Sequence, residues 1–147
     1  VFTDGSLLVM NTGELLRTMN AKDGMALRFA TDRGYQIIII TGGNSPGVHK
    51  RFIGLGLEEV HIAISDKLTL LKELMLHYSL SKDELVYTGD DFNDLECMRH
   101  VDLSCAPKDA DPYVKKNAEL VLERNGGDAC VREIIQKVLE AQENWLH

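Results

Sequence analysis

The amino-acid sequence predicts an α/β fold in which helices cover both faces of a mostly parallel sheet. Short apolar runs of strand type alternate along the chain with longer segments that carry helix-start and helix-stop signals. The run YQIIII, residues 35–40, is apolar and β-branched, as in a parallel strand buried on both faces. Polar residues follow three of the strands directly, and parallel sheets bind ligands at the carboxyl ends of strands.

The first elements are a β-hairpin and a helix. Two apolar runs, 7–10 and 15–19, are joined by Asn11-Thr12-Gly13-Glu14, which is typical of a hairpin turn. A helix is expected over 24–33, with Gly34 as its stop signal.

The remaining elements continue the alternation of strands and helices. After the strand at 35–40, we expect a helix from Ser45-Pro46 to about 55, a strand at 60–64, a helix from 67 to about 78 capped by Asp66, a strand at 85–87, a short helix at 91–99, a strand at 103–105, a helix at 109–117, a strand at 120–122 and, after Gly126-Gly127, a helix from about 129 to 141.

Composition narrows the class of protein. The 147 residues, of which 44% are hydrophobic, suit a single domain over 1–147 with a sizeable core. A net charge of −7 argues against a nucleic-acid partner. Cys97, Cys105 and Cys130 are isolated, which favours reduced thiols in a cytoplasmic protein over disulfides or structural zinc. No apolar run approaches the ~20 residues of a membrane span, so no membrane partner is expected.

Three carboxylates, Asp90, Asp91 and Asp94, follow the strand at 85–87 within the stretch YTGDDFND. Two unit charges about 5 Å apart repel by roughly 3 kcal/mol at an effective dielectric near 20, so the cluster needs a cation, donors or solvent. Mg²⁺ prefers oxygen ligands, which predicts Asp90 as a metal ligand and Asp91 and Asp94 as second-shell residues that orient it or its waters. The alternative is that Asp91 and Asp94 cap the following helix.

Two further strand ends carry groups suited to an anion. Thr41, Gly42 and Gly43 precede a helix start, where a hydroxyl and backbone N–H groups can converge on a phosphate. The alternative is a tight glycine turn in which Thr41 satisfies its own loop.

Lys67 begins a helix, where the dipole disfavours a cation unless an anion lies nearby. The alternative is a solvated surface lysine. Together, Thr41, Lys67 and a metal on Asp90 suit the stabilisation of a transferring phosphoryl group.

A larger set of short motifs has a recognisable order and spacing. The set is Thr3-Asp4-Gly5, Gly13-Glu14, Asn20-Ala21-Lys22-Asp23-Gly24, Thr41-Gly42, Ser45-Pro46, Asp66-Lys67-Leu68, Gly89-Asp90-Asp91, Gly126-Gly127 and Arg132-Glu133. Over nearly the whole chain it resembles the 3-deoxy-octulosonate 8-phosphate (KDO 8-phosphate) phosphatases of the haloacid dehalogenase (HAD) superfamily. The resemblance implies a Rossmann-like HAD fold without a separate cap domain, and a Mg²⁺-dependent phosphatase.

The same resemblance places the family's DxDG motif, with its nucleophile and general acid/base, in the four positions before Val1. The N-terminal strand that carries this motif is therefore expected outside the sequence, and Val1 is expected to lie within a longer protein. Asp4 is not the nucleophile, because a DxD ending there would put Phe2 at the attacking position. Where the family often has a substrate-binding arginine, this chain has Gly43, and Ala129 replaces a family glycine.

By resemblance, Thr41, Lys67 and Asp90 are catalytic, and the substrate contacts Lys67 and a second group of residues. That group is Asn20, Ala21, Lys22, Asp23, Gly24, Arg28 and Arg51. Lys22, Arg28 and Arg51 are cations that can face a sugar-acid carboxylate, although Arg28 is equally suited to a solvated helix face. The expected reaction is hydrolysis of KDO 8-phosphate through an aspartyl phosphate. The alternatives are a nine-carbon keto-deoxy sugar acid 9-phosphate and a non-catalytic oligomerisation domain like that of sialic-acid cytidylyltransferases.

Assembly is the last expectation. The intervals between Gly5, Thr41 and Lys67 are too short for a cap domain, so another structure must exclude water from the site. The hairpin holds more apolar residues than it can bury on itself, and an isolated hairpin is marginal in water. As in the family that the chain resembles, we expect a homotetramer held by residues 7–19.

Overall fold

The computed structural model describes residues 1–146, and its strands form three groups. The hairpin is antiparallel, and the other strands pair in parallel, in a two-stranded and a three-stranded group with the order β5-β6-β7. The strands are β1 (Leu8–Val9), β2 (Leu15–Leu16), β3 (Ile38–Ile40), β4 (Glu59–His61), β5 (Val86–Thr88), β6 (Leu103–Ala106) and β7 (Leu120–Val121).

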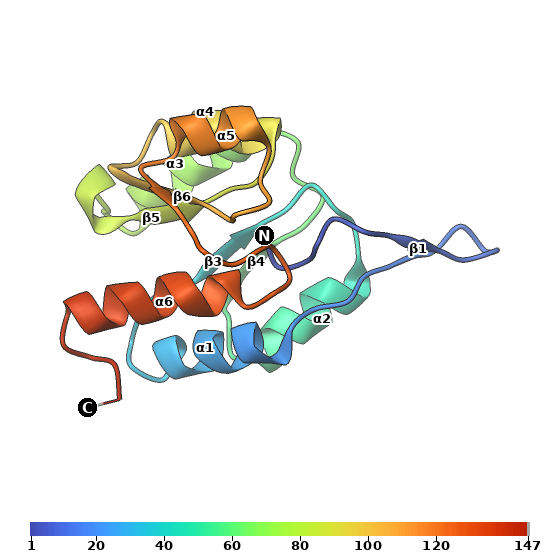
Figure 1. Cartoon of the computed structure of the whole chain (residues 1–147), viewed down its shortest axis with the longest axis horizontal. Helices are drawn as coiled ribbons and strands as arrows, with labels where there is room; N and C mark the ends of the chain where they lie inside the picture. Colours follow the sequence, from blue (N-terminus) through green and yellow to red (C-terminus); the bar gives the residue numbers. More distant parts are fainter. Residues whose placement is uncertain (147) are drawn as a thin grey trace.

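The helices lie in two layers on opposite sides of the parallel strands, which confirms the predicted α/β fold (Figure 1). One layer holds α1 (Ala21–Thr31), α2 (Pro46–Gly54) and α6 (Cys130–Ala141). The other holds α3 (Lys67–His77), α4 (Leu95–Met98) and α5 (Pro112–Asn117). Two 3₁₀ turns, η1 (Lys82–Glu84) and η2 (Phe92–Asp94), precede β5 and α4. None of the helices within residues 1–146 combines the length and the apolar character that crossing a membrane requires.

Each layer has its own apolar core. Between α1, α2, α6 and the strands, the buried residues include Leu27, Ile39 and Phe52. On the other side, Met98 and Val114 belong to a second buried cluster, and smaller contacts around α3 extend it. The three cysteines are buried and free, as expected of reduced thiols.

Helix starts follow the capping signals of the sequence, with corrections at α1 and at α5. The helix predicted from residue 109 begins at Pro112, where the Asp111 side chain supplies the cap. The Ser45 side chain accepts a hydrogen bond from Val48 N, and the Asp66 side chain accepts one from Thr69 N. The predicted start of α1 at residue 24 was wrong, because the helix begins at Ala21. The Asn20 carboxamide accepts from Lys22 N and supplies the cap three residues earlier.

The strands predicted at 35–40 and 60–64 are longer than the observed ones. Only Ile38–Ile40 of the run 35–40 is strand, and only Ile39 within it is fully buried. The strand predicted at 60–64 runs instead from Glu59 to His61. Beyond it, Ala63 N donates to Gly43 O at 2.9 Å and Ile64 N donates to Thr41 O at 3.0 Å. The segment after β4 therefore leaves the sheet to hold the loop after β3, which positions the site described below.

The hairpin projects from the body of the molecule (Figure 1). Its strands are only two residues each, with Leu8 opposite Leu16 and Val9 opposite Leu15. Its apolar side chains are exposed in the monomer, with Leu8 at 63% and Val9 at 66% exposure. A hairpin of this kind gains little stability from its own contacts.

Candidate active site

The polar segments after β3, β4 and β5 meet at the carboxyl ends of the strands. Backbone hydrogen bonds tie the first two segments together, as described above. A pocket of about 280 Å³ opens beside the third and is strongly acidic. Its lining residues are Thr3, Asp4, Gly5, Asp90, Asp91, Asp109 and Asp111. Thr41 and Lys67 do not line this pocket.

Lys67 is a buried, paired lysine rather than a solvated surface one. Its Nζ lies 2.8 Å from Asp94 Oδ1, and the two side chains are 10% and 6% exposed. The pair joins the start of α3 to the loop after β5 and brings together two of the three predicted strand-end groups. The surface alternative considered from the sequence is therefore wrong.

Asp94 is the centre of a hydrogen-bond network. Its Oδ1 accepts from Lys67 and from the Tyr87 hydroxyl at 2.9 Å, while its Oδ2 accepts from the backbone N–H groups of Asp90 at 3.1 Å and Asp91 at 3.4 Å. Burial by itself would raise the pKa of Asp94. The hydrogen bond and charge of Lys67, with the Asp90 N–H and the Tyr87 hydroxyl, outweigh burial and hold that pKa below its ordinary value.

Gly89 makes this geometry possible. A Cβ at Gly89 would lie 2.4 Å from Asp94 Cβ and 3.0 Å from Met98 Sδ, so any side chain there would force the loop apart. The absence of a side chain on Gly89 lets the Asp94 carboxylate reach the backbone N–H of Asp90. Asp94 thus positions both Asp90, the candidate metal ligand, and Lys67, the candidate phosphate-binding lysine.

Asp90 has the exposure that a metal ligand needs. Its carboxylate is 40% exposed and lines the acidic pocket. The pocket offers only hard oxygen donors, which fit Mg²⁺. Within residues 1–146 there is no preassembled group of three metal-binding side chains, and Mg²⁺ typically takes one or two carboxylates with water and phosphate.

Asp91 and Thr41 both use their side chains locally. Asp91 Oδ1 accepts from Phe92 N at 2.7 Å, and Asp94 reciprocates by accepting from Asp91 N, so both carboxylates also cap the 3₁₀ turn η2. Thr41 Oγ1 accepts from Gly43 N at 3.1 Å and closes its own loop. The hydroxyl proton of Thr41 is not used in that bond and can be donated to an anion.

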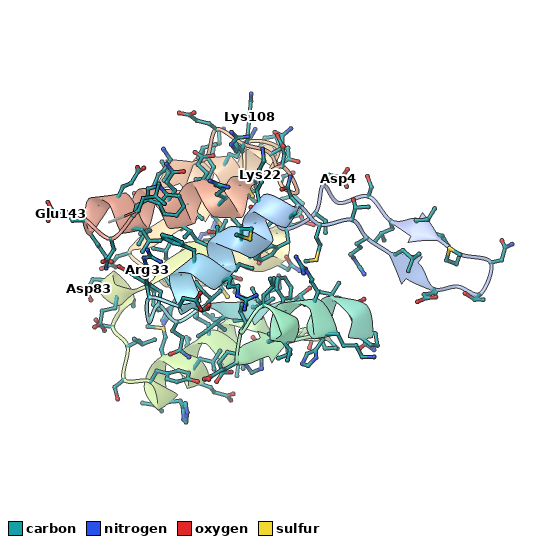
Figure 2. The ribbon with its side chains drawn as sticks, turned by 90° about the horizontal axis from the view of Figure 1, so that it is seen from below. Asp4, Lys22, Arg33, Asp83, Lys108 and Glu143 are labelled. Carbon is teal, nitrogen blue, oxygen red and sulfur yellow. The ribbon has the colours of Figure 1, made fainter. Side chains whose placement is uncertain are left out.

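The segment Asn20–Gly24 lies on the first turn of α1, near the base of the hairpin. Figure 2 shows Lys22 on this turn. Asp23 is 1% exposed and its Oδ1 accepts from Arg132 N at 2.9 Å, at the start of α6. Burial raises the pKa of Asp23 above its ordinary value, and the N–H groups of α6 offset only part of that shift. In this structure Asp23 therefore holds two helices together.

Neither of the two predicted substrate-binding arginines lines the acidic pocket beside Asp90. The Arg51 guanidinium crosses Gly24, with Nη2 2.8 Å from the position that a Cβ there would take. This contact brings α1 and α2 together and explains the glycine. Arg28 is exposed on the last turn of α1, where its side chain has no hydrogen-bond or ion-pair partner within residues 1–146.

Two residues that contact the site were not predicted from the sequence. Tyr87, inside β5, bonds the Asp94 carboxylate, and burial followed by the negative charge of Asp94 raises the pKa of its phenol. Its position two residues before Gly89, in a strand, was the available signal. Arg17 follows β2 directly and places its guanidinium beside Gly43. No short sequence pattern indicates that contact, because it depends on the path of the hairpin.

Comparison with known proteins identifies the family. A family model described as haloacid dehalogenase-like hydrolase matches residues 59–134. The 3-deoxy-D-manno-octulosonate 8-phosphate phosphatase KdsC of Escherichia coli (strain K12) is 33% identical over 142 residues, which cover 97% of this chain and 76% of that protein.

Solved structures agree with the sequence comparison. The 3-deoxy-D-manno-octulosonate 8-phosphate phosphatase from Yersinia pestis superposes with a TM-score of 0.94 at 33% identity, covering 98% of this chain and 78% of that one. The enzyme of the same name from Moraxella catarrhalis, in complex with a magnesium ion, a phosphate ion and KDO, gives a TM-score of 0.94 at 26% identity over 99% and 83% of the chains. The chain therefore belongs to the KDO 8-phosphate phosphatase family of HAD hydrolases and is a phosphoric monoester hydrolase.

Proposed function

We propose that the full-length protein hydrolyses KDO 8-phosphate to KDO and inorganic phosphate with Mg²⁺ as cofactor. The observation that carries the proposal is the Asp94 network, which links Lys67 to the backbone of Asp90 at the strand ends. Such a network preorganises a cation and a carboxylate on either side of a phosphate. Family membership and the magnesium, phosphate and KDO bound by the Moraxella catarrhalis enzyme support the substrate.

In this proposal each group has a separate role. Asp90 would hold the Mg²⁺ with water and phosphate oxygens, and the metal supplies charge stabilisation at the phosphoryl group. Lys67, held in position by Asp94, would neutralise a phosphate oxygen. The Thr41 hydroxyl donates a hydrogen bond to another phosphate oxygen, and the backbone N–H groups of its loop also donate to the phosphate. Asp91 and Asp94 hold the metal-binding loop in place from the second shell.

The covalent step belongs to the DxDG motif that the resemblance places before Val1. We infer that its first aspartate attacks phosphorus while the bond from phosphorus to the ester oxygen breaks. The second aspartate gives its proton to the leaving sugar hydroxyl. Water, deprotonated by that same aspartate, then attacks the aspartyl phosphate and releases inorganic phosphate. The cycle consumes only the phosphate ester and water, and it regenerates both aspartates.

The organic part of the substrate and the assembly belong to the same proposal. The segment Asn20–Gly24, with Arg28 and Arg51, would contact the sugar acid, and Lys22, which is exposed on the first turn of α1, is available for it.

The exposed hairpin supports a homotetramer in which residues 7–19 of several copies pair, so that each copy shields a neighbour's site. Three buried free thiols support a cytoplasmic location.

A phosphate-release screen with full-length protein tests the function. The substrates are the eight-carbon and nine-carbon keto-deoxy sugar acid phosphates and a simple hexose phosphate, each with and without Mg²⁺. We expect the eight-carbon acid to give the highest kcat/KM, and release to require the metal. A higher kcat/KM for the nine-carbon acid would change the substrate, and preference for the hexose phosphate would refute a sugar-acid pocket.

A further inference from the structure

The guanidinium of Arg17 lies against the loop that follows β3. Arg17 comes directly after β2 and is half-buried, whereas its neighbours Leu16 and Thr18 are exposed. Its Nη2 atom lies 3.4 Å from the position that a Cβ on Gly43 would take, and Thr41 Oγ1 lies 3.5 Å from the same point. Arg17 and the Thr41 hydroxyl therefore face one small region at the edge of the site.

Gly43 leaves the space that Arg17 uses. The residue is not among the glycines with positive φ, so backbone conformation does not explain a glycine here. The nearest heavy atoms that a side chain would meet are the Arg17 guanidinium and Thr41 Oγ1. A side chain longer than alanine at this position would occupy the region that Arg17 now reaches.

Arg17 has no partner of its own in the described part of the chain. None of the hydrogen bonds or ion pairs within residues 1–146 uses its side chain. A guanidinium carries five N–H donors in one plane, in a geometry that matches both oxygens of a carboxylate. A half-buried guanidinium whose donors are all unused is suited to an anion supplied by a ligand.

We propose that Arg17 binds the carboxylate of the sugar-acid substrate and determines the preference for acids over neutral sugar phosphates. The inference rests on the proposed function, under which the substrate carries two anions. The phosphate already has Lys67, Thr41 and the metal on Asp90 as partners. Arg17 approaches the loop after β3 from the hairpin side, and the phosphate would lie at the strand ends. The rest of the substrate must therefore extend away from the strand ends, toward the hairpin.

The test compares Arg17→Ala and Arg17→Lys with wild-type full-length protein on two substrates. One is KDO 8-phosphate and the other is ribose 5-phosphate, which lacks a carboxylate. We expect Arg17→Ala to lower kcat/KM for the acid about 10- to 100-fold, mainly through KM, as for a lost charge-assisted hydrogen bond. The kcat/KM for ribose 5-phosphate should change less than about threefold, and Arg17→Lys should retain part of the preference for the acid. Arg99→Ala, an exposed arginine bonded to Asn117, is the matched control.

Calorimetry supplies a readout that does not depend on turnover. KDO itself should bind more weakly to Arg17→Ala by the same factor, while inorganic phosphate should bind as it does to the wild type. Gly43→Leu should displace the guanidinium and lower the acid-to-neutral ratio without adding to the effect of Arg17→Ala. Melting curves would show that each variant is folded.

Three outcomes would overturn the proposal. Equal losses on both substrates would place Arg17 on the phosphate, and no loss on either substrate would place it in solvent. A wild-type protein that neither hydrolyses KDO 8-phosphate nor binds KDO would refute the proposed function together with this inference. In the first two outcomes the wild type stays active on the acid, so the failures are distinguishable.

Discussion

Lys67 Nζ donates to Asp94 Oδ1 across 2.8 Å, joining the first residue of α3 to the last residue of the turn that follows β5. Both side chains are almost fully buried. A buried pair of this kind contributes less through its own net energy than through the positions it imposes. Here it sets the lysine at the helix start and, through the other carboxylate oxygen, the backbone of Asp90.

The first prediction concerns catalysis by Lys67. Lys67→Ala removes a positive charge aimed at the phosphate and should lower kcat at least ~10²-fold, as loss of a transition-state donor does. Lys72→Ala, an exposed lysine on the same helix, is the control and should leave kcat unchanged. A fall in kcat of less than about threefold would remove Lys67 from the catalytic machinery.

Asp94→Asn should destabilise the fold, because it leaves the Lys67 ammonium buried without its charge partner. We expect a loss of about 3 kcal/mol in the free energy of unfolding, measured by urea denaturation at pH 7. The pKa of Asp94 is lowered by folding, so its contribution is present above the unfolded pKa of about 3.9 and is lost as the pH falls through the lower folded value. The difference between wild type and variant should therefore be constant above about pH 5 and shrink below about pH 4. A difference that grew on acidification would contradict this assignment.

Tyr87→Phe removes one donor to Asp94 and leaves the ring in place. The expected loss is about 1.5 kcal/mol in stability, as for a hydrogen bond to a charged group, with Lys67 still paired. Tyr113→Phe is the matched control, because Tyr113 is exposed and its hydroxyl makes no bond within residues 1–146. Equal stability of the two variants in urea would show that the Tyr87 hydroxyl does not support the network.

The general fold was predictable because local signals agree with it. Apolar runs predicted where the strands lie along the chain, and Ser45 and Asp66 predicted two helix starts because their side chains cap those helices. The proximity of the loops that carry Thr41, Lys67 and Asp90 was predictable because strand ends meet at one edge of a parallel sheet. The start of α1 was missed because the Asn20 cap was assigned only to substrate binding.

Contacts between distant elements were not predictable in the same way. Burial of Asp94 depends on how α3 packs beside β5, and no residue spacing encodes that distance. The strand at 60–64 was predicted too long, since the backbone of Ala63 and Ile64 bonds the neighbouring loop rather than the sheet. Arg17 was missed because its position follows from the path of the hairpin and the absence of a side chain on Gly43.

The hairpin should hold the assembly. Leu8→Glu places a charge on an exposed apolar strand and should convert the expected tetramer into smaller species, with light scattering showing a fall from about four protomer masses. Leu76→Glu changes a leucine on α3 that is even more exposed than Leu8 and is the control. If wild-type protein is a fully active monomer at nanomolar concentration, sites shared between copies are ruled out.

The most direct measurement is Mg²⁺-dependent phosphate release from KDO 8-phosphate by Asp90→Asn in the full-length protein. The side chain keeps its size but loses the charge that the metal needs, so turnover should be abolished and Mg²⁺ should bind more weakly, while the melting curve stays that of a folded protein. Asp102→Asn, an exposed carboxylate just before β6, should behave as the wild type does. Undiminished Mg²⁺-dependent activity in Asp90→Asn would contradict the account of this site.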